Sequence, residues 1–220
     1  MKKITFKYNA FLLFLITVLL FQFSCKKGDN PVIDPTPVVT IGFQVWTQNN
    51  LDVRVYRNGD PIPQVTDPTV WGNLTTGAWC WYNNDSATNA IYGKLYNWYA
   101  VNDSRGLAPS GYHIATDAEW TQLTDFLGGA AVAAGKIRTT SGWTLPNTGA
   151  TNSTGFSSLP GGYRNSDGTF RLIGGLTSWW SSTETNTTNA WSRIIGYNNI
   201  IVGRGSLNKT LGNSVRCVRN

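Results

Sequence analysis

The chain has 220 residues, a formal net charge of +6 and only 14% charged residues, yet it contains ten tryptophans. This length allows one domain with a sizeable core. The charge is too small for a nucleic-acid-binding protein, and no basic stripe with interleaved aromatic residues is present. The composition suits a loop-rich fold outside the cytoplasm, held by aromatic packing, better than a cytosolic enzyme, because each buried aromatic removes a large apolar area from water.

Residues 1–24 predict a lipoprotein signal peptide. Three lysines lie within the first seven residues, and residues 10–21 are almost wholly apolar. This apolar run has the length of a signal-peptide core and is short for a membrane span. Ser24 then precedes Cys25, which is the arrangement of a bacterial lipoprotein cleavage site. Cys25 is therefore expected to become the lipid-carrying N-terminus.

Two residues depart from such sites: Gln22 stands where leucine is usual, and Phe23 is bulky. An uncleaved N-terminal anchor therefore stays open as the alternative. Either way the protein is expected in the cell envelope, anchored to a membrane. The outer membrane is the expected location, and the sequence does not decide between its periplasmic face and its outer face. Cleavage would remove three lysines and lower the formal charge of the mature chain from +6 to +3. Residues 25–37 hold three prolines and predict an extended tether, so that 38–220 form the single domain.

The domain is expected to begin with strands, because residues 38–46 and 51–56 alternate between apolar and polar side chains. Residues 78–82 could form a short buried strand. The aromatic stretch 92–101 leaves helix and strand open and is expected in the core. Five further short strands are predicted at 170–173, 178–182, 190–196, 199–202 and 214–218, separated by glycine and asparagine turns.

Residues 108–127 carry the clearest helix signals. Thr116 and Glu119 have the spacing of a capping box, in which each side chain bonds the other residue's backbone N–H. Trp120 and Leu123 follow on one helix face, and two glycines at 128–129 end the helix. Residues 130–137 predict a second short helix, and 139–155 predict a long polar loop.

Five ordered segments resemble the Fibrobacter succinogenes major paralogous domain family over roughly residues 40–220. They are YGKLYNWY at 92–99, PSGYHIATDAEW at 109–120, GFSSLPGGYR at 155–164, WWSSTE at 179–184 and SVRCVR at 214–219. The resemblance implies an α+β, C-type-lectin-like fold, related to the formylglycine-generating and sulfatase-modifying group. In that fold two helices pack on small irregular antiparallel sheets, the N- and C-terminal strands pair, and long loops cover one side.

The family pattern usually has a cysteine before Pro-Ser-Gly, whereas this chain has Ala108 there. A bridge from that position to the last strand therefore cannot form. Once Cys25 carries lipid, only Cys80 and Cys217 remain. A disulfide between them in the oxidising exterior and two buried free thiols are both open.

Catalysis is the less favoured hypothesis. His113 is the only histidine, and its place just before the helix cap favours a structural role. No hydrolase, metalloprotease or phosphate-binding motif is present, and one histidine with two cysteines argues against a zinc site. Asp117 and Glu119 are explained by the electrostatics of the helix N-terminus. The sulfatase-modifying relatives use a cysteine pair near the chain end, where Cys217 stands alone.

Ligand binding is the second hypothesis. The fold implied by the resemblance often presents ligands to a loop surface, sometimes through calcium, and Asn83, Asn84 and Asp85 carry the oxygen ligands that calcium prefers. A solvated turn is the alternative, and the sugar-binding Glu-Pro-Asn triplet of true lectins is absent. Ser86 follows in an Asp-Ser-Ala sequence that resembles a short Bacteroidetes O-glycosylation signal.

The tryptophans at 179, 180 and 191 could form a sugar-stacking platform. However, adjacent strand residues face opposite ways, so a core role is expected for the first two. We therefore expect a lipid-anchored envelope protein that displays a non-catalytic binding module for carbohydrate or another surface protein. No cofactor is expected, with bound calcium as the alternative, and an enzyme is the alternative function.

Overall fold

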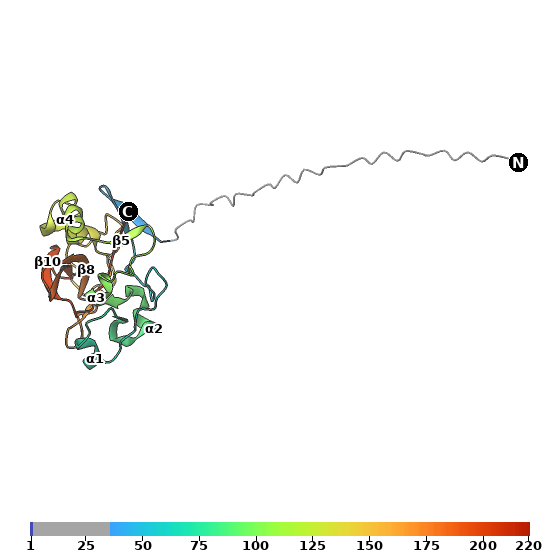
Figure 1. The fold of residues 1–220 in the computed structure, drawn as a ribbon. Coiled ribbons are helices and arrows are strands. Elements are labelled where there is room, and N and C mark those ends of the chain that lie inside the picture. The colour runs from blue at the N-terminus through green and yellow to red at the C-terminus, as the bar shows by residue number, and fades with distance from the viewer. Residues whose placement is uncertain (2–35) are drawn as a thin grey trace. The chain divides into compact units, whose positions relative to one another are not determined.

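The computed structural model describes Met1 and residues 36–220, and residues 36–220 form one compact unit. The predicted signal peptide, the lipidation site Cys25 and most of the predicted tether lie outside the described residues. Figure 1 shows small sheets and short helices joined by long irregular segments. In the part of the chain that is described, no helix is long and apolar enough to cross a membrane. The domain is an α+β fold, as the sequence predicts.

The first sheet joins the two ends of the domain (Figure 1). Its order is β1-β2-β11-β5, and all neighbours are antiparallel. In β11, Val218 lies opposite Trp46 of β2 and His113 of β5. The expected pairing of N- and C-terminal strands is therefore confirmed. The strands are β1 (Val38–Ile41), β2 (Gln44–Thr47), β5 (Tyr112–Ile114) and β11 (Cys217–Arg219).

The C-terminal half contains a second, antiparallel sheet with the order β10-β9-β8. Two small hairpins complete the strands: β3 with β4, and β6 with β7. The bounds are β3 (Trp79–Cys80), β4 (Leu95–Tyr96), β6 (Tyr163–Arg164), β7 (Phe170–Arg171), β8 (Leu176–Glu184), β9 (Asn189–Gly196) and β10 (Gly203–Asn208).

The two helices expected from the sequence are the longest of the described residues, α4 and α5. The capping box of α4 is confirmed: Glu119 N–H donates to the Thr116 hydroxyl at 3.2 Å, and Thr116 N–H donates to the Glu119 carboxylate at 2.7 Å. Trp120 and Leu123 are fully buried on its inner face. The helices are α1 (Pro68–Gly72), α2 (Ser86–Asn89), α3 (Trp98–Val101), α4 (Asp117–Phe126) and α5 (Ala130–Ile137), with short 3₁₀ helices at Tyr82–Asn84 and Ala90–Tyr92.

Strand β8 forms a wall between two parts of the core. Its neighbours Trp179 and Trp180 are both fully buried, although adjacent strand side chains point to opposite faces. Trp179 packs against Trp120 with ring centroids 5.4 Å apart. Trp180 belongs to the other cluster, where its indole N–H donates to the Tyr96 carbonyl at 2.8 Å. Both faces of β8 are thus covered, and the hypothesis that this pair is a sugar-stacking platform is wrong.

Three strand predictions are corrected by the structure. Residues 38–46 form a hairpin rather than one strand, because Gly42 takes a positive φ of 61° and turns the chain between β1 and β2. Residues 51–56 form no continuous ladder, because Leu51 N–H donates to Val215 while Tyr56 N–H donates to Asp60. Residues 199–202 bond α5 instead of a strand, and β10 begins only at 203.

Candidate functional site

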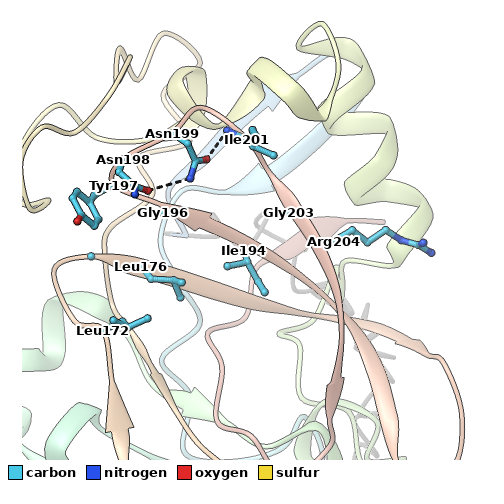
Figure 2. Close-up of a pocket in the computed structure, with 11 residues that line it drawn as sticks. Leu172, Leu176, Ile194, Gly196, Tyr197, Asn198, Asn199, Ile201, Gly203 and Arg204 are labelled. Atoms are coloured by element: carbon cyan, nitrogen blue, oxygen red, sulfur yellow. Dashed lines mark hydrogen bonds between the residues drawn. The ribbon is translucent and has the colours of Figure 1, made fainter.

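A surface groove of about 480 Å³ opens where the β8–β9–β10 sheet meets the segment 172–175 and the turn 197–201. Figure 2 shows Leu172, Leu176 and Ile194 around the same space. These aliphatic side chains give the groove an apolar floor. At its rim, Leu172 is 56% exposed and Ile201 is 51% exposed. Exposed aliphatic residues beside a concave apolar surface are typical of a binding site.

Two glycines keep part of the groove empty. A Cβ at Gly196 would come no closer than 3.6 Å to another residue, and a Cβ at Gly203 no closer than 3.4 Å, to the Ile194 carbonyl. Neither glycine has a positive φ. The fold would therefore tolerate side chains at both positions, and their absence leaves space that a ligand can use.

The polar groups around the groove are largely satisfied within the protein. The Asn199 amide donates to Asn198 at 3.2 Å and accepts the N–H of Ile201 at 2.9 Å, as the dashed lines in Figure 2 show. Arg204 forms three hydrogen bonds to Asp117, at 2.7, 3.1 and 3.2 Å, and its guanidinium lies 3.3 Å from the centroid of the Trp191 ring. The groove therefore offers apolar contact more than free hydrogen-bonding groups.

Asp117 is the anchor of this charged rim. Its carboxylate also accepts from Arg193, at 2.5 Å. Burial would raise the pKa of Asp117, but hydrogen bonds from Arg204 and Arg193 outweigh it, and the pKa lies below its ordinary value. The carboxylate is therefore ionised at neutral pH and holds Arg204 against Trp191.

The predicted calcium loop lies in another part of the domain and forms a helix cap. Asp85 is the N-cap of α2: its carboxylate accepts from Ala87 N–H at 2.8 Å and from the Thr88 hydroxyl at 2.5 Å. The bond from Thr88 is the main reason that the pKa of Asp85 is lowered. Asn83 and Asn84 take positive φ values of 50° and 58°. Among the described residues, no group of three or more histidine, cysteine or acidic side chains could hold a metal ion.

Ser86, the predicted glycosylation site, is the first residue of α2 and is exposed. The structure thus places its hydroxyl where a modifying enzyme could reach it. Glycosylation of Ser86 stays a prediction.

Cys80 and Cys217 are both buried and free. Burial raises the pKa of each thiol to about 12. They belong to different core clusters: Cys80 packs with Trp71, and Cys217 packs in the cluster that contains Ala108. The disulfide between them is therefore not formed, and the alternative of two buried thiols describes the structure.

His113 lies beside a carboxylate but not in a deep cavity. Its Nε2 is 2.6 Å from Glu119 and its Nδ1 is 2.8 Å from the Asn220 amide oxygen. The side chain is 39% exposed, and the same Glu119 bonds the backbone of Thr116. His113 therefore joins β5 to the helix cap and the chain end, which is the structural role expected from the sequence.

The fold is an α+β domain with an open apolar groove beside its second sheet. Comparison with known protein families matches residues 39–219 to the Fibrobacter succinogenes major domain. The chain belongs to this family. No match was found among curated proteins, and none was found among solved structures.

The groove was not predicted from the sequence, because the segments that line it were interpreted only as strands and turns. A signal exists in retrospect: glycines at 196 and 203 bracket a turn rich in asparagine and isoleucine. Isoleucines in a turn with no strand partner indicate an exposed apolar surface.

Proposed function

We propose that this protein is a lipid-anchored component of the cell envelope, held at the outer membrane, whose domain is a non-catalytic binding module. In this proposal the groove between the start of β10 and residues 172–176 binds an apolar segment of another surface protein. The observation that carries the proposal is the open aliphatic floor formed by Leu176 and Ile194 next to the exposed Ile201.

A protein segment suits this groove better than a carbohydrate. Sugars need hydrogen-bonding groups that are free to pair with hydroxyls, whereas Asn198 and Asn199 bond to each other and Arg204 is neutralised by Asp117. Aliphatic side chains of a partner would instead bury the floor and both rim residues, at about 25 cal/mol for each Å² removed from water.

The enzyme alternative has less support. His113 uses both ring nitrogens in contacts with Glu119 and Asn220, and Glu119 is already engaged in the capping box. A general base must reach the proton that it removes, and neither group points to the groove residues described above.

We also propose that the α+β domain is C-type-lectin-like. Support comes from the β2–β11 pairing of the chain ends, the two helices α4 and α5, and the long irregular segment between α5 and β6. In this fold the loops next to the second sheet are a natural place for a ligand, which agrees with the position of the groove.

The binding proposal is tested by cross-linking in the native cell envelope. A photoreactive phenylalanine analogue at Ile201 is expected to give one dominant protein adduct. The same analogue at Ile91, which is 70% exposed, serves as the control and should not give it. Gly203→Leu fills the groove and should abolish the adduct. Equal adducts from both positions, or an adduct insensitive to Gly203→Leu, would contradict the proposal.

The anchor is tested separately in the same cells. Globomycin, which blocks lipoprotein signal cleavage, should cause the uncleaved precursor to accumulate, and a labelled fatty acid should be incorporated into the wild-type protein but not into Cys25→Ser. A wild-type protein that stays in the membrane fraction without incorporating the label would favour the uncleaved anchor and leave the groove result standing.

A further inference from the structure

A second cavity, of about 270 Å³, lies between residues 75–77 and the turn that follows α3. Its lining differs from that of the groove, because it contains hydroxyl, amide, carboxylate and guanidinium groups around aromatic rings. Its lining includes Thr75, Thr76, Tyr99, Asn102, Asp103 and Arg105. Its volume lies just below the range of about 300–1,000 Å³ that is typical of pockets for drug-sized ligands, which suits a single sugar ring.

Several polar side chains at this cavity have no partner within the described residues. The hydroxyls of Thr75, Thr76 and Tyr99 and the amide of Asn102 take part in no hydrogen bond there, and the Tyr99 ring stacks on no other ring. In the groove, by contrast, Asn199 is already bonded. This cavity therefore offers both donors and acceptors, next to an aromatic ring, that a ligand can use.

The charged groups of the cavity are rigid and carry no excess positive charge. Arg105 donates to Asp103 at 2.9 and 2.8 Å and to Asp60 at 3.4 Å. Its guanidinium also lies 4.1 Å from the centroid of the Tyr56 ring, which holds its plane in place. Two carboxylates around one guanidinium leave a local charge of −1, so phosphates and acidic sugars are disfavoured.

The hydroxyl of Tyr56 lies behind the cavity wall, next to Gly77. The Tyr56 hydroxyl is buried without a hydrogen-bond partner. A Cβ on Gly77 would come within 2.0 Å of this hydroxyl, so only glycine fits there. Gly77 lines the cavity. Burial and the neighbouring Asp103 raise the pKa of Tyr56 to about 12. The phenol therefore stays neutral at physiological pH and leaves the charge balance of the site unchanged.

We propose that this cavity binds one ring of a neutral saccharide. The Tyr99 ring packs against the apolar C–H face of the sugar, as aromatic side chains favour apolar contact. Sugar hydroxyls pair with the Thr75 and Thr76 hydroxyls and the Asn102 amide, which have no partner within the described residues, while Asp103 and Arg105 stay bonded to each other. The site is separate from the groove, so it extends the proposed function without depending on it.

The test uses residues 36–220, which contain all three core clusters of the described fold. The ¹⁵N-labelled domain is titrated with methyl glycosides of glucose, galactose, mannose, xylose and N-acetylglucosamine. At least one should shift the backbone amide signals of residues 102–105, which are retained in both cavity variants, with a dissociation constant on the order of 1 mM. Glucuronate and inorganic phosphate should bind at least about tenfold more weakly, because of the local negative charge.

Tyr99→Ala and Asn102→Ala should each weaken sugar binding about tenfold, while the dispersion of the remaining amide signals shows that the fold is intact. Ile201→Ser, in the groove, is the matched control and should leave sugar binding unchanged. No shift with any neutral glycoside, tighter binding of glucuronate, or unchanged binding in both cavity variants would overturn the proposal. The cross-linking result at Ile201 is independent of each of these outcomes.

Discussion

Among single residues, His113 connects three separate parts of the fold. Its two ring nitrogens contact Glu119 at the start of α4 and Asn220 at the chain end, while its backbone lies in β5. Burial lowers the pKa of His113, but the bonds to Asn220 and Glu119 outweigh it, so the pKa lies above 6.5. Burial raises the pKa of Glu119, but the bonds from Thr116 and His113 outweigh it, so that pKa lies below 4.5.

These shifts predict a pH-dependent stability. A raised histidine pKa contributes stability that is complete below about pH 6.5 and is lost as the pH rises through the folded-state value. His113→Gln should therefore be less stable than wild type at pH 5.5, and the difference should shrink towards pH 8.5. Because the side chain is 39% exposed, the effect is expected to stay below about 1 kcal/mol. Thermal unfolding of both proteins across this pH range measures it. A difference that is constant with pH would show that charge plays no part.

Among the elements, the long loops are held by three buried arginines. Arg138, Arg164 and Arg216 are at most 1% exposed, and none of them forms an ion pair with a carboxylate of the described residues. Each instead donates to backbone carbonyls of distant segments: Arg138 to 148 and 196, Arg164 to 65, 66 and 168, and Arg216 to 47, 156 and 157. Each guanidinium also lies over an aromatic ring.

Arg216→Met should therefore lower the free energy of unfolding far more than the same substitution at the exposed Arg171. Several buried carbonyls would lose their donor, at about 1–3 kcal/mol for each group left unpaired, so a total loss of about 3–5 kcal/mol is expected. Urea unfolding of residues 36–220 measures the change. Arg171→Met, on the exposed face of β7, is the matched control and should change stability by less than about 0.5 kcal/mol. Equal losses of unfolding free energy in the two variants would mean that the bonds from Arg216 to the buried carbonyls contribute little to stability.

The elements that the sequence predicted correctly are those specified by local signals. Helix α4 follows from a cap and an apolar face that lie within eleven residues of each other, Thr116 to Phe126. One segment was predicted wrongly because its backbone bonds are distant. Residues 199–202 have strand-like composition, but Val202 N–H donates to Ala130 of α5 and Ile200 accepts from Ala134. The groove depends on this turn, so it could not be predicted from periodicity either.

For the whole molecule, the central feature is that the two ends of the domain formed by residues 36–220 pair without a disulfide bond among the described residues. Val218 pairs with Trp46, Arg216 bonds the Thr47 carbonyl, and Trp179 donates to Asn50 at 2.9 Å. The resemblance to the family implied the strand pairing, whereas the arginine and indole bonds needed the structure. Ala108, where the family pattern has cysteine, lies in the same core cluster as Cys217. Apolar packing therefore replaces a bridge at this position.

A domain closed in this way should be insensitive to reducing agents. A disulfide that was lost on reduction would typically lower stability by about 2–5 kcal/mol, whereas the buried free thiols Cys80 and Cys217 have no bond to lose. The melting temperature of residues 36–220 should therefore be the same with and without dithiothreitol. A thiol titration of the unreduced protein should give two sulfhydryls after denaturation and none before, because both side chains are fully buried. A lower melting temperature in dithiothreitol, with no thiols in the denatured protein, would instead require the two core clusters to rearrange around a bridge.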